Sequence, residues 1–308
     1  MFNTSHYLLF LSIMLIITDI GWCIYIMFAK RDVLLKNEGQ RLWQTALVIT
    51  ILIAVFFFHT YIYTHKKVIL SISWILLAGS LIFTFLFRWF FNQLMGARER
   101  THEILETVLC IIETRDPNLE GHSLYVKQLT MLLYEALPFR YRMRLNPENL
   151  QYAALLLDIG KLGIPNSIIN KSGKLNEKEL ESISRHTEFG ETILKSVPSF
   201  DKISLWIKYH HERIDGTGYY HLKDREIPFE SRLIAVADTF SALTMDKNYR
   251  PTLSYIEAIN ELKLSSGLQL DPELVDYFCN IPLNKIEASR NSVKAKIQQF
   301  HKLFVSES

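Results

Sequence analysis

The sequence has few cysteines and no paired cysteine motif. Its three cysteines, Cys23, Cys110 and Cys279, lie far apart in the chain and form no Cys-x-x-Cys pair. This distribution indicates a reducing compartment and excludes a thiolate metal site of the zinc-finger kind. We therefore expect the cysteines to be packing residues.

The alternation of apolar and polar residues that is typical of half-buried strands is also absent, as are internal repeats and low-complexity tracts. Amphipathic stretches with the helical period instead occupy residues 200–211, 231–243 and 255–263. Asn146 before Pro147, and Asn176 three residues before Glu179, are typical of helix N-termini. The sequence therefore predicts an all-α fold built as a helical bundle.

A strong excess of one charge is missing too. The net charge of the chain is +2. The residues up to Phe91 hold seven Lys and Arg against three acids, a balance of +4, so the remaining residues carry a net charge of −2. Proteins that bind nucleic acid usually carry a basic face or a basic excess. The near-neutral C-terminal part therefore argues against a nucleic acid polymer as a partner.

Long apolar runs are present in the first third of the chain. Residues 7–29, 45–64 and 68–87 are each almost continuously apolar over about 20 residues, the length that a helix needs to cross a bilayer. The first run lacks a cleavage site for a signal peptidase, so we expect it to be retained. Lys and Arg are more numerous between the first two runs than between the last two, which predicts an external N-terminus and a cytoplasmic C-terminal part.

These features divide the chain into four parts. We predict a three-span membrane anchor at 1–91, a connecting helix at 92–112, a helical domain at 113–285 and a C-terminal helix or tail at 286–308. Apolar residues such as Ile104, Leu105 and Val108 recur at helical spacing in the connecting helix. This seam could pair two protomers in a homodimer, and packing against the following domain explains the same pattern equally well.

Histidines carry the strongest chemical signal. Among the seven that follow Phe91, His210 and His211 are adjacent and precede Glu212 and Asp215-Gly216. Both imidazoles can face one metal cluster only if the helix ends beside it, and we place that end at Asp215-Gly216. Imidazole and carboxylate are ligands for Fe, Mn, Zn or Ni, and a carboxylate can bridge two ions.

This pair belongs to a series of five motifs in a fixed order, and together they make the signal specific. They are Arg115-Asp116-Pro117 with Gly121-His122-Ser123, Leu157-Asp158-Ile159-Gly160-Lys161 with Gly163-Ile164-Pro165, His186, the segment from His210 to Tyr219, and Ala237-Asp238. In this order and at these spacings the chain resembles the HD-GYP family over about residues 113–280.

The resemblance implies a helical domain in which several helices supply ligands to two, sometimes three, metal ions, usually iron or manganese. It implies hydrolysis of cyclic di-GMP to pGpG or GMP. The positions that match family ligands are His122, Asp158, His186, His210, His211 and Asp238, with Asp158 as the bridging carboxylate. Lys161 matches a lysine that approaches the scissile phosphate, and Tyr219, Lys247 and Arg250 match substrate-binding positions. For Lys161 and Tyr219 a packing role is the alternative.

The chain departs from the family pattern at one ligand. Leu157 stands where the family has the histidine of its His-Asp pair, and a leucine neither coordinates nor hydrogen-bonds. Tyr220 replaces the proline of the Gly-Tyr-Pro signature, Ser241 replaces a common Asp, and Asn118 replaces the Glu of members with a third metal. We therefore expect one or two ions per chain, with the ion beside Leu157 held more weakly.

Two functions are consistent with this pattern. The first is a phosphodiesterase of the bacterial inner membrane that hydrolyses cyclic di-GMP or a related cyclic dinucleotide with reduced activity. The second is a non-catalytic receptor or interaction module that binds cyclic di-GMP or a partner such as a diguanylate cyclase. Retention of six ligand-type residues favours the enzyme, and loss of an aligned ligand favours the receptor.

Overall fold

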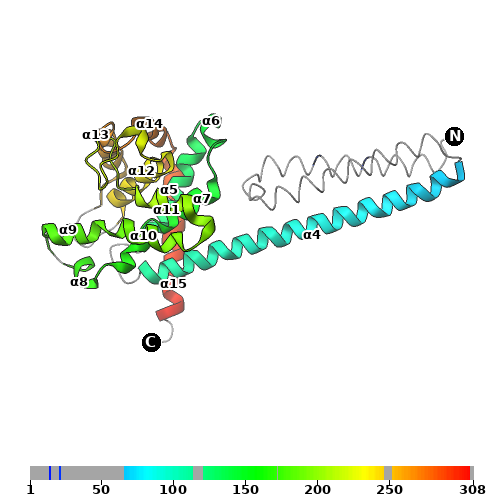
Figure 1. The fold of residues 1–308 in the computed structure, drawn as a ribbon, viewed down its shortest axis with the longest axis horizontal. Helices are drawn as coiled ribbons and strands as arrows, with labels where there is room; N and C mark the ends of the chain where they lie inside the picture. The colour runs from blue at the N-terminus through cyan, green and yellow to red at the C-terminus, as the bar shows by residue number, and fades with distance from the viewer. Residues whose placement is uncertain are drawn as a thin grey trace. The chain divides into compact units, whose positions relative to one another are not determined.

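The computed structural model describes residues 66–113, 121–171, 173–245 and 252–305, together with Met14 and Gly21. In these ranges the regular elements are helices, with one isolated bridge between Ser266 and Leu270 (Figure 1). The prediction of an all-α fold is confirmed for this part of the chain. The elements are α4 (Lys66–Glu113), α5 (His122–Ala136), α6 (Phe139–Arg142), α7 (Pro147–Leu156), η1 (Ile159–Gly163), α8 (Asn166–Ile169), α9 (Glu177–Ser184), α10 (His186–Lys195), η2 (Pro198–Phe200), α11 (Asp201–Lys208), η3 (Asp224–Glu226), α12 (Phe229–Thr244), α13 (Tyr255–Ser265), α14 (Pro272–Cys279) and α15 (Leu283–Val305).

The prediction of a membrane anchor is wrong. Among the described residues, no helix combines the length with the sustained apolar character that crossing a bilayer requires. This finding overturns the three transmembrane helices, and with them the inner-membrane location that we inferred from the apolar runs. The runs at 7–29 and 45–64 lie outside the described residues apart from Met14 and Gly21, and the run at 68–87 falls within α4.

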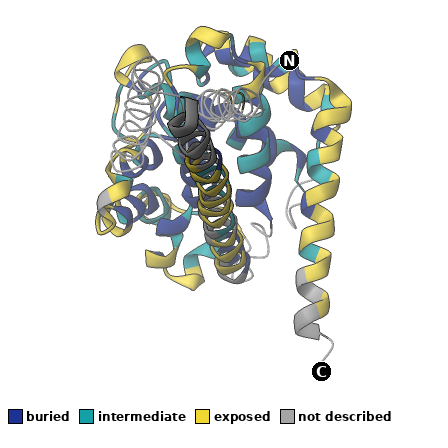
Figure 2. Cartoon of the chain, turned by 90° about the vertical axis from the view of Figure 1, so that its right-hand side faces the viewer, coloured by how far each residue is buried: buried dark blue, intermediate teal, exposed yellow. Residues whose placement is uncertain are grey.

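The chain divides into two compact units, residues 1–101 and residues 102–308. The second unit contains the main hydrophobic core. In it, α5 packs against α7, α12 and α15, while α10 packs against α11 and η1. Leu129, Leu133 and Leu150 are fully buried, and the rings of Phe240 and Phe278 pack at a tilt of 49° with 4.9 Å between their centroids. Figure 2 shows the buried residues on the inner faces of the helices and the exposed ones outside.

Capping residues determine where several helices begin. The Asn146 side chain accepts hydrogen bonds from the backbone of Glu148 and Asn149 at the start of α7, and Asn176 forms a capping box with Glu179 at the start of α9. Both starts agree with the sequence prediction. Asp271 caps α14 in the same way. Because these caps are local, they can be read from neighbouring residues.

Two details differ from the expected local structure. Helix α11 ends at Lys208, before the adjacent histidines, so the predicted helix end at Asp215-Gly216 is wrong. Lys161 lies in the 3-10 helix η1, where its backbone N–H donates to the Asp158 carbonyl at 2.9 Å. Three-residue spacing in a 3-10 helix places side chains one above the other, so Asp158 and Lys161 still share a face.

A glycine allows η1 to lie directly against α10. A Cβ atom on Gly160 would lie 1.8 Å from the carbonyl oxygen of His186 and 2.5 Å from the backbone nitrogen of Gly190. No larger residue fits this approach without moving the backbone. The glycine of the Leu157–Lys161 motif therefore brings Asp158 close to His186.

The end of α4 belongs to the second unit. Leu109 and Cys110 are buried in its core, whereas Ile104 and Val108 are exposed. Part of the apolar seam in the connecting helix therefore packs against the domain that follows it. A homodimer formed through the remaining face stays a prediction.

Candidate metal centre

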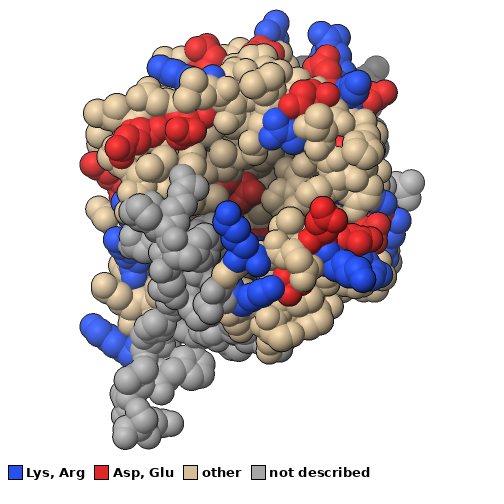
Figure 3. Space-filling view, turned by 90° about the vertical axis from the view of Figure 1, so that its left-hand side faces the viewer, with Lys and Arg blue, Asp and Glu red and all other residues tan. Residues whose placement is uncertain are grey.

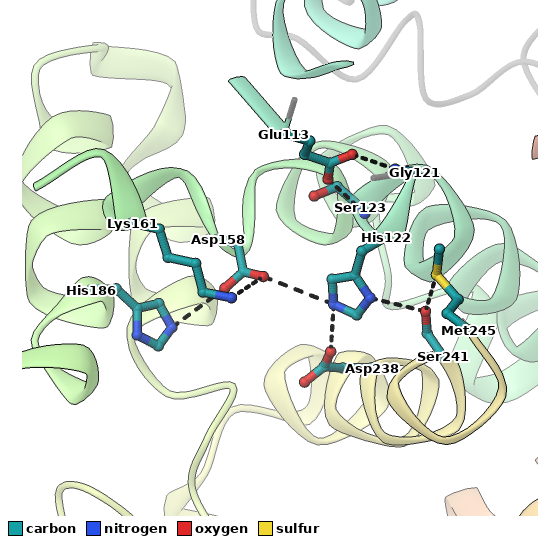
Figure 4. Close-up of polar contacts among 10 residues, drawn as sticks. All are labelled: Glu113, Gly121, His122, Ser123, Asp158, Lys161, His186, Asp238, Ser241 and Met245. Atoms are coloured by element: carbon teal, nitrogen blue, oxygen red, sulfur yellow. Dashed lines mark hydrogen bonds and ion pairs between the residues drawn. The ribbon is translucent and has the colours of Figure 1, made fainter. Parts of the chain in front are cut away.

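Six side chains that the sequence singled out converge from five parts of the second unit. Figure 4 shows four of them, His122, Asp158, His186 and Asp238. His122 is the first residue of α5, His186 is the first residue of α10, and Asp158 directly precedes η1. Asp238 lies on α12, and His210 and His211 follow the end of α11. Five of the six lie at helix ends or in turns, and Asp238 lies within α12. The local backbone conformation therefore restricts the positions of these side chains.

His122 and Asp238 form one side of the centre. His122 Nε2 lies 3.0 Å from Asp238 Oδ1 and 3.8 Å from Asp158 Oδ2. Its other nitrogen, Nδ1, lies 3.0 Å from Ser241 Oγ, and the Ser241 hydroxyl donates to Met245 Sδ at 3.3 Å. Because the Ser241 hydroxyl donates its proton to the Met245 sulfur, its oxygen acts as the acceptor for the N–H at His122 Nδ1. The other ring nitrogen, Nε2, faces the carboxylates.

Asp158 connects the two sides. Its Oδ2 accepts a hydrogen bond from Lys161 Nζ at 2.9 Å, and its Oδ1 lies 3.6 Å from His186 Nε2 (Figure 4). One carboxylate oxygen therefore faces His122 and the other faces His186. This is the placement that a bridging carboxylate requires.

Three histidines form the other side. One ligand nitrogen from each of His186, His210 and His211 lies within 4.8 Å of the others. His186 Nδ1 hydrogen-bonds to the Ile183 carbonyl at 2.7 Å, and His210 Nδ1 hydrogen-bonds to the Ile207 carbonyl at 2.5 Å. A carbonyl only accepts, so in both rings Nδ1 carries the proton and Nε2 presents a bare lone pair.

Both of these Nε2 atoms are buried and lack a hydrogen-bond partner among the described residues. A buried acceptor without a partner costs about 1–3 kcal/mol, so two side by side need an explanation. A divalent cation would use both lone pairs, and a backbone carbonyl behind the ring is the usual support for a metal-binding histidine. The residues therefore fit a metal ion.

The electrostatics of the site keep its ligands in the forms that bind metal. Burial, together with the neighbouring His210 and Lys161, outweighs the carboxylate of Asp158 and lowers the pKa of His186 to about 4. Burial and His210 likewise lower the pKa of His211 well below its usual value. Both rings are therefore neutral near pH 7, as a metal ligand must be.

The two aspartates are held in the ionised form. Burial would by itself raise the pKa of Asp158, but the charge of Lys161, and the charges that His186 and His122 carry when protonated, outweigh it and hold that pKa far below its ordinary range. Burial opposes ionisation of Asp238 too, but the hydrogen bond that His122 donates to it when the ring is protonated overcomes this effect, so the pKa of Asp238 is also strongly lowered. Near pH 7 the centre thus combines the neutral rings of His186 and His211 with two anionic carboxylates.

A pocket of about 100 Å³ opens beside the histidines. Its lining includes His211, Asp238, Tyr219 and Gln269, and the Tyr219 ring lies 5.1 Å from the His211 ring between centroids. Figure 3 shows a hollowed face with acidic atoms at its floor and Lys or Arg at its edge. Acidic atoms at the floor suit a cation, and basic groups at the edge suit an anionic ligand bound to it.

The loop after the histidines is held by the buried carboxylate of Glu212, to which the sequence analysis assigned no role. Glu212 accepts hydrogen bonds from the backbone N–H groups of Tyr220 at 2.6 Å and Leu222 at 2.7 Å. The Tyr220 hydroxyl lies 2.8 Å from Thr187 Oγ1, next to His186. No pattern of neighbouring residues signals these contacts, because they form eight or more residues apart or between separate elements.

Other predicted site residues have different outcomes. Leu157 is 1% exposed and belongs to the hydrophobic core, so the position of the missing ligand is filled by packing. Lys247, Arg250 and Asn118 lie outside the described residues. Substrate contacts for the first two stay predictions.

The helices and the converging histidines and aspartates define a class, the helical His-Asp domains that bind divalent cations. The family model described as "HD domain" matches residues 106–274, which is more than half of the chain. The chain belongs to this family, and its ordered motifs and its relatives make it an HD-GYP member.

Several curated proteins are similar to this chain. It is 33% identical to 3'3'-cGAMP-specific phosphodiesterase 1 of Vibrio cholerae over 71% of this chain and 47% of that protein. It is 35% identical to phosphodiesterase 3 of the same name and organism over 53% of this chain and 35% of that protein. It is also 35% identical to a cyclic di-GMP phosphodiesterase of Thermotoga maritima over 58% of this chain and 49% of that protein. The chain thus spans half or less of these relatives' lengths.

Proposed function

We propose that this chain is a metal-dependent phosphodiesterase that hydrolyses a cyclic dinucleotide, either cyclic di-GMP or 3'3'-cGAMP. The observation that carries the proposal is the pair of buried, bare Nε2 atoms of His186 and His210 beside the Asp158 carboxylate. The names of the relatives support the substrate class, because they act on one or the other of these dinucleotides.

The metal-binding residues fall into two groups. His186, His210 and His211 with Asp158 would hold one ion, and His122 and Asp238 with the same Asp158 would hold a second, more weakly. Nitrogen and carboxylate donors suit iron or manganese. When bound, such ions supply Lewis acidity toward a phosphate and lower the pKa of water.

The chain's own residues have separate parts in this proposal. Lys161 holds the Asp158 carboxylate at 2.9 Å, and with a side chain that is 25% exposed its ammonium can also face a phosphate group. Tyr219 is 45% exposed beside His211 and can stack on or hydrogen-bond to a nucleotide. Lys247 and Arg250 would hold the substrate phosphates by charge.

The test is metal content together with turnover. Purification of the chain without oxygen, with iron or manganese supplied, should give close to one tightly held ion and measurable cleavage of cyclic di-GMP or 3'3'-cGAMP. His210→Ala should lose the ion and the activity, because it removes one bare nitrogen. A chain that carries no transition metal and cleaves neither dinucleotide would reject the proposal.

A second function has one specific observation in its favour. Leu157 is packed into the core at a position where the family has a ligand, which removes one donor from the His122 side. A receptor that binds the dinucleotide without cleaving it needs no second ion. Tight binding of cyclic di-GMP by the metal-loaded chain without turnover would identify this function.

A further inference from the structure

Helix α5 begins without a cap from its own neighbours. Its N-cap is Gly121, which has no side chain and adopts a left-handed φ of 76°. The first backbone N–H groups of a helix have no partner inside the helix and need acceptors from elsewhere. Here the acceptor is the carboxylate of Glu113, the last residue of α4.

Glu113 binds the backbone on both sides of a metal-site histidine. Its Oε2 accepts from the Gly121 N–H at 2.8 Å and its Oε1 accepts from the Ser123 N–H at 2.9 Å (Figure 4). His122 lies between these two donors. Glu113 itself is 5% exposed, so the two hydrogen bonds are shielded from water.

The imidazole of His122 has little freedom once its backbone is held in this way. Its Nε2 faces Asp238 at 3.0 Å and its Nδ1 faces Ser241 at 3.0 Å. Both partners lie on α12, while Glu113 lies on α4. The ring direction therefore depends on a carboxylate from a different helix.

The end of α4 is fixed to the same part of the domain by a second buried carboxylate. Glu106 lies seven residues before Glu113, on the same face of the helix, and pairs with Lys127 of α5 and Lys296 of α15. Its contacts do not reach the first turn of α5. Glu106 therefore contacts α5 beyond its first turn and α15, whereas Glu113 binds the backbone on both sides of His122.

We propose that Glu113 is a positioning residue for His122, and that it sets the metal affinity of the His122 side of the centre. This inference rests on the proposed function, because it concerns the same metal site. The three-histidine side does not depend on Glu113, since the rings of His186 and His210 are held by the carbonyls of Ile183 and Ile207.

The experiment is a Mn²⁺ titration of the full chain followed by electron paramagnetic resonance, which resolves tight and weak binding. Glu113→Gln keeps the size of the side chain but points an amide toward one backbone N–H. It should weaken the weak Mn²⁺ class by at least about tenfold, as loss of a supporting residue does, and leave the tight class unchanged. Glu106→Gln, an equally buried carboxylate on the same face, is the control and should change neither class.

A second measurement does not require metal. Long-range proton–nitrogen correlation spectra of the histidine rings in the metal-free chain should show His122 in one well-defined state, and Glu113→Gln should broaden or shift that signal alone. The inference is overturned if Glu113→Gln lowers only the melting temperature, weakens both Mn²⁺ classes equally, or leaves the His122 ring signal unchanged. A wild-type chain that binds no Mn²⁺ would instead reject the proposed function, and the ring signal would still decide the role of Glu113.

Discussion

At the scale of single residues, the same local hydrogen bond orients two histidines for metal binding. His186 and His210 each hydrogen-bond through Nδ1 to the carbonyl of the residue three positions earlier. This local backbone geometry keeps the proton on Nδ1, and Nε2 is buried without a hydrogen-bond partner among the described residues. Two buried lone pairs beside an ionised Asp158 are costly without a cation, so stability and metal binding must be linked.

The lowered pKa of His186 predicts how the metal-free protein responds to acid. Its folded pKa is about 4, below the ordinary value of 6.5, so the unfolded chain binds the proton more tightly. Stability is then complete above about pH 6.5 and falls as the pH drops toward 4, by on the order of 3 kcal/mol for this group. Urea unfolding of the metal-free chain at a series of pH values measures this loss.

The variant His186→Gln is the control for this prediction, because it is uncharged throughout the range. Its stability should fall less steeply between pH 6.5 and 4 than that of the wild type. Parallel curves for the two proteins would show that His186 does not cause the acid sensitivity.

The buried Leu157 predicts a gain of function. Leu157→His would place an imidazole at the family's ligand position and should raise the metal content from near one to near two ions per chain. Cyclic dinucleotide turnover should rise by at least about tenfold, which corresponds to about 1.4 kcal/mol of barrier. Elemental analysis and a turnover assay on the same preparation measure both quantities.

Leu157→Gln provides the control, since it adds polarity to the core without an imidazole. It should lower stability without adding an ion, because a polar group in this core has no partner. If Leu157→His takes up a second ion and gains no activity, the leucine does not limit catalysis and the receptor function is favoured.

At the scale of elements, the segment after α11 is held by hydrogen bonds within itself and by contacts to α10 and to the end of α11. Tyr220 stands where the family motif has proline, and its ring packs edge-on against Tyr209 at 5.4 Å. Its hydroxyl contacts Thr187, and Lys208 lies 5.2 Å from its ring. The tyrosine thus fixes the loop through contacts, whereas a proline would do so by restricting φ.

Glu212 should be the main support of this loop. In Glu212→Gln one carboxylate oxygen becomes an amide that faces a backbone N–H, so one of the donors, Tyr220 or Leu222, loses its acceptor. We expect a loss of about 1–3 kcal/mol in the free energy of unfolding. Urea denaturation measures it.

The matched control is Glu188→Gln, which removes a carboxylate whose Arg185 partner is well exposed. Exposed ion pairs contribute little, so its stability should stay within about 0.5 kcal/mol of the wild type. Equal effects of the two substitutions would show that Glu212 does not support the loop as its hydrogen bonds indicate.

At the scale of the whole molecule, the core and the metal centre belong to one compact unit, residues 102–308. The ligands of the centre come from elements far apart in the chain that pack around α5, α10 and α12. A cation that binds several of them can do so only in the folded state. It should therefore stabilise the whole unit and not one helix.

We expect a fragment of residues 102–308 to fold alone with a single cooperative transition. Mn²⁺ at about 100 times its dissociation constant should add about 2.7 kcal/mol to its stability. Thermal unfolding followed by circular dichroism, with and without Mn²⁺, measures the shift. The same shift in His210→Ala would mean that the cation binds elsewhere, and a fragment without a cooperative transition would contradict the division of the chain at residue 101.

The sequence alone determined the helical class of the fold and several helix starts, and it picked out the six histidines and aspartates that the fold brings together. Ordered motifs identify candidate ligands because their chemistry is a property of residue type, and caps such as Asn146 and Asn176 act on backbone groups two or three residues away. The apolar runs, by contrast, led to a membrane anchor that the described helices do not support.

Only the tertiary structure decided the contacts that support the centre. Glu113 and Glu212 act on backbone groups eight to ten residues away, and the Ser241 contact to His122 joins two separate helices. The same holds for the approach of η1 to α10, which depends on the absence of a side chain at Gly160. These interactions form because packing brings distant backbone groups together, and local periodicity carries no information about which ones will meet.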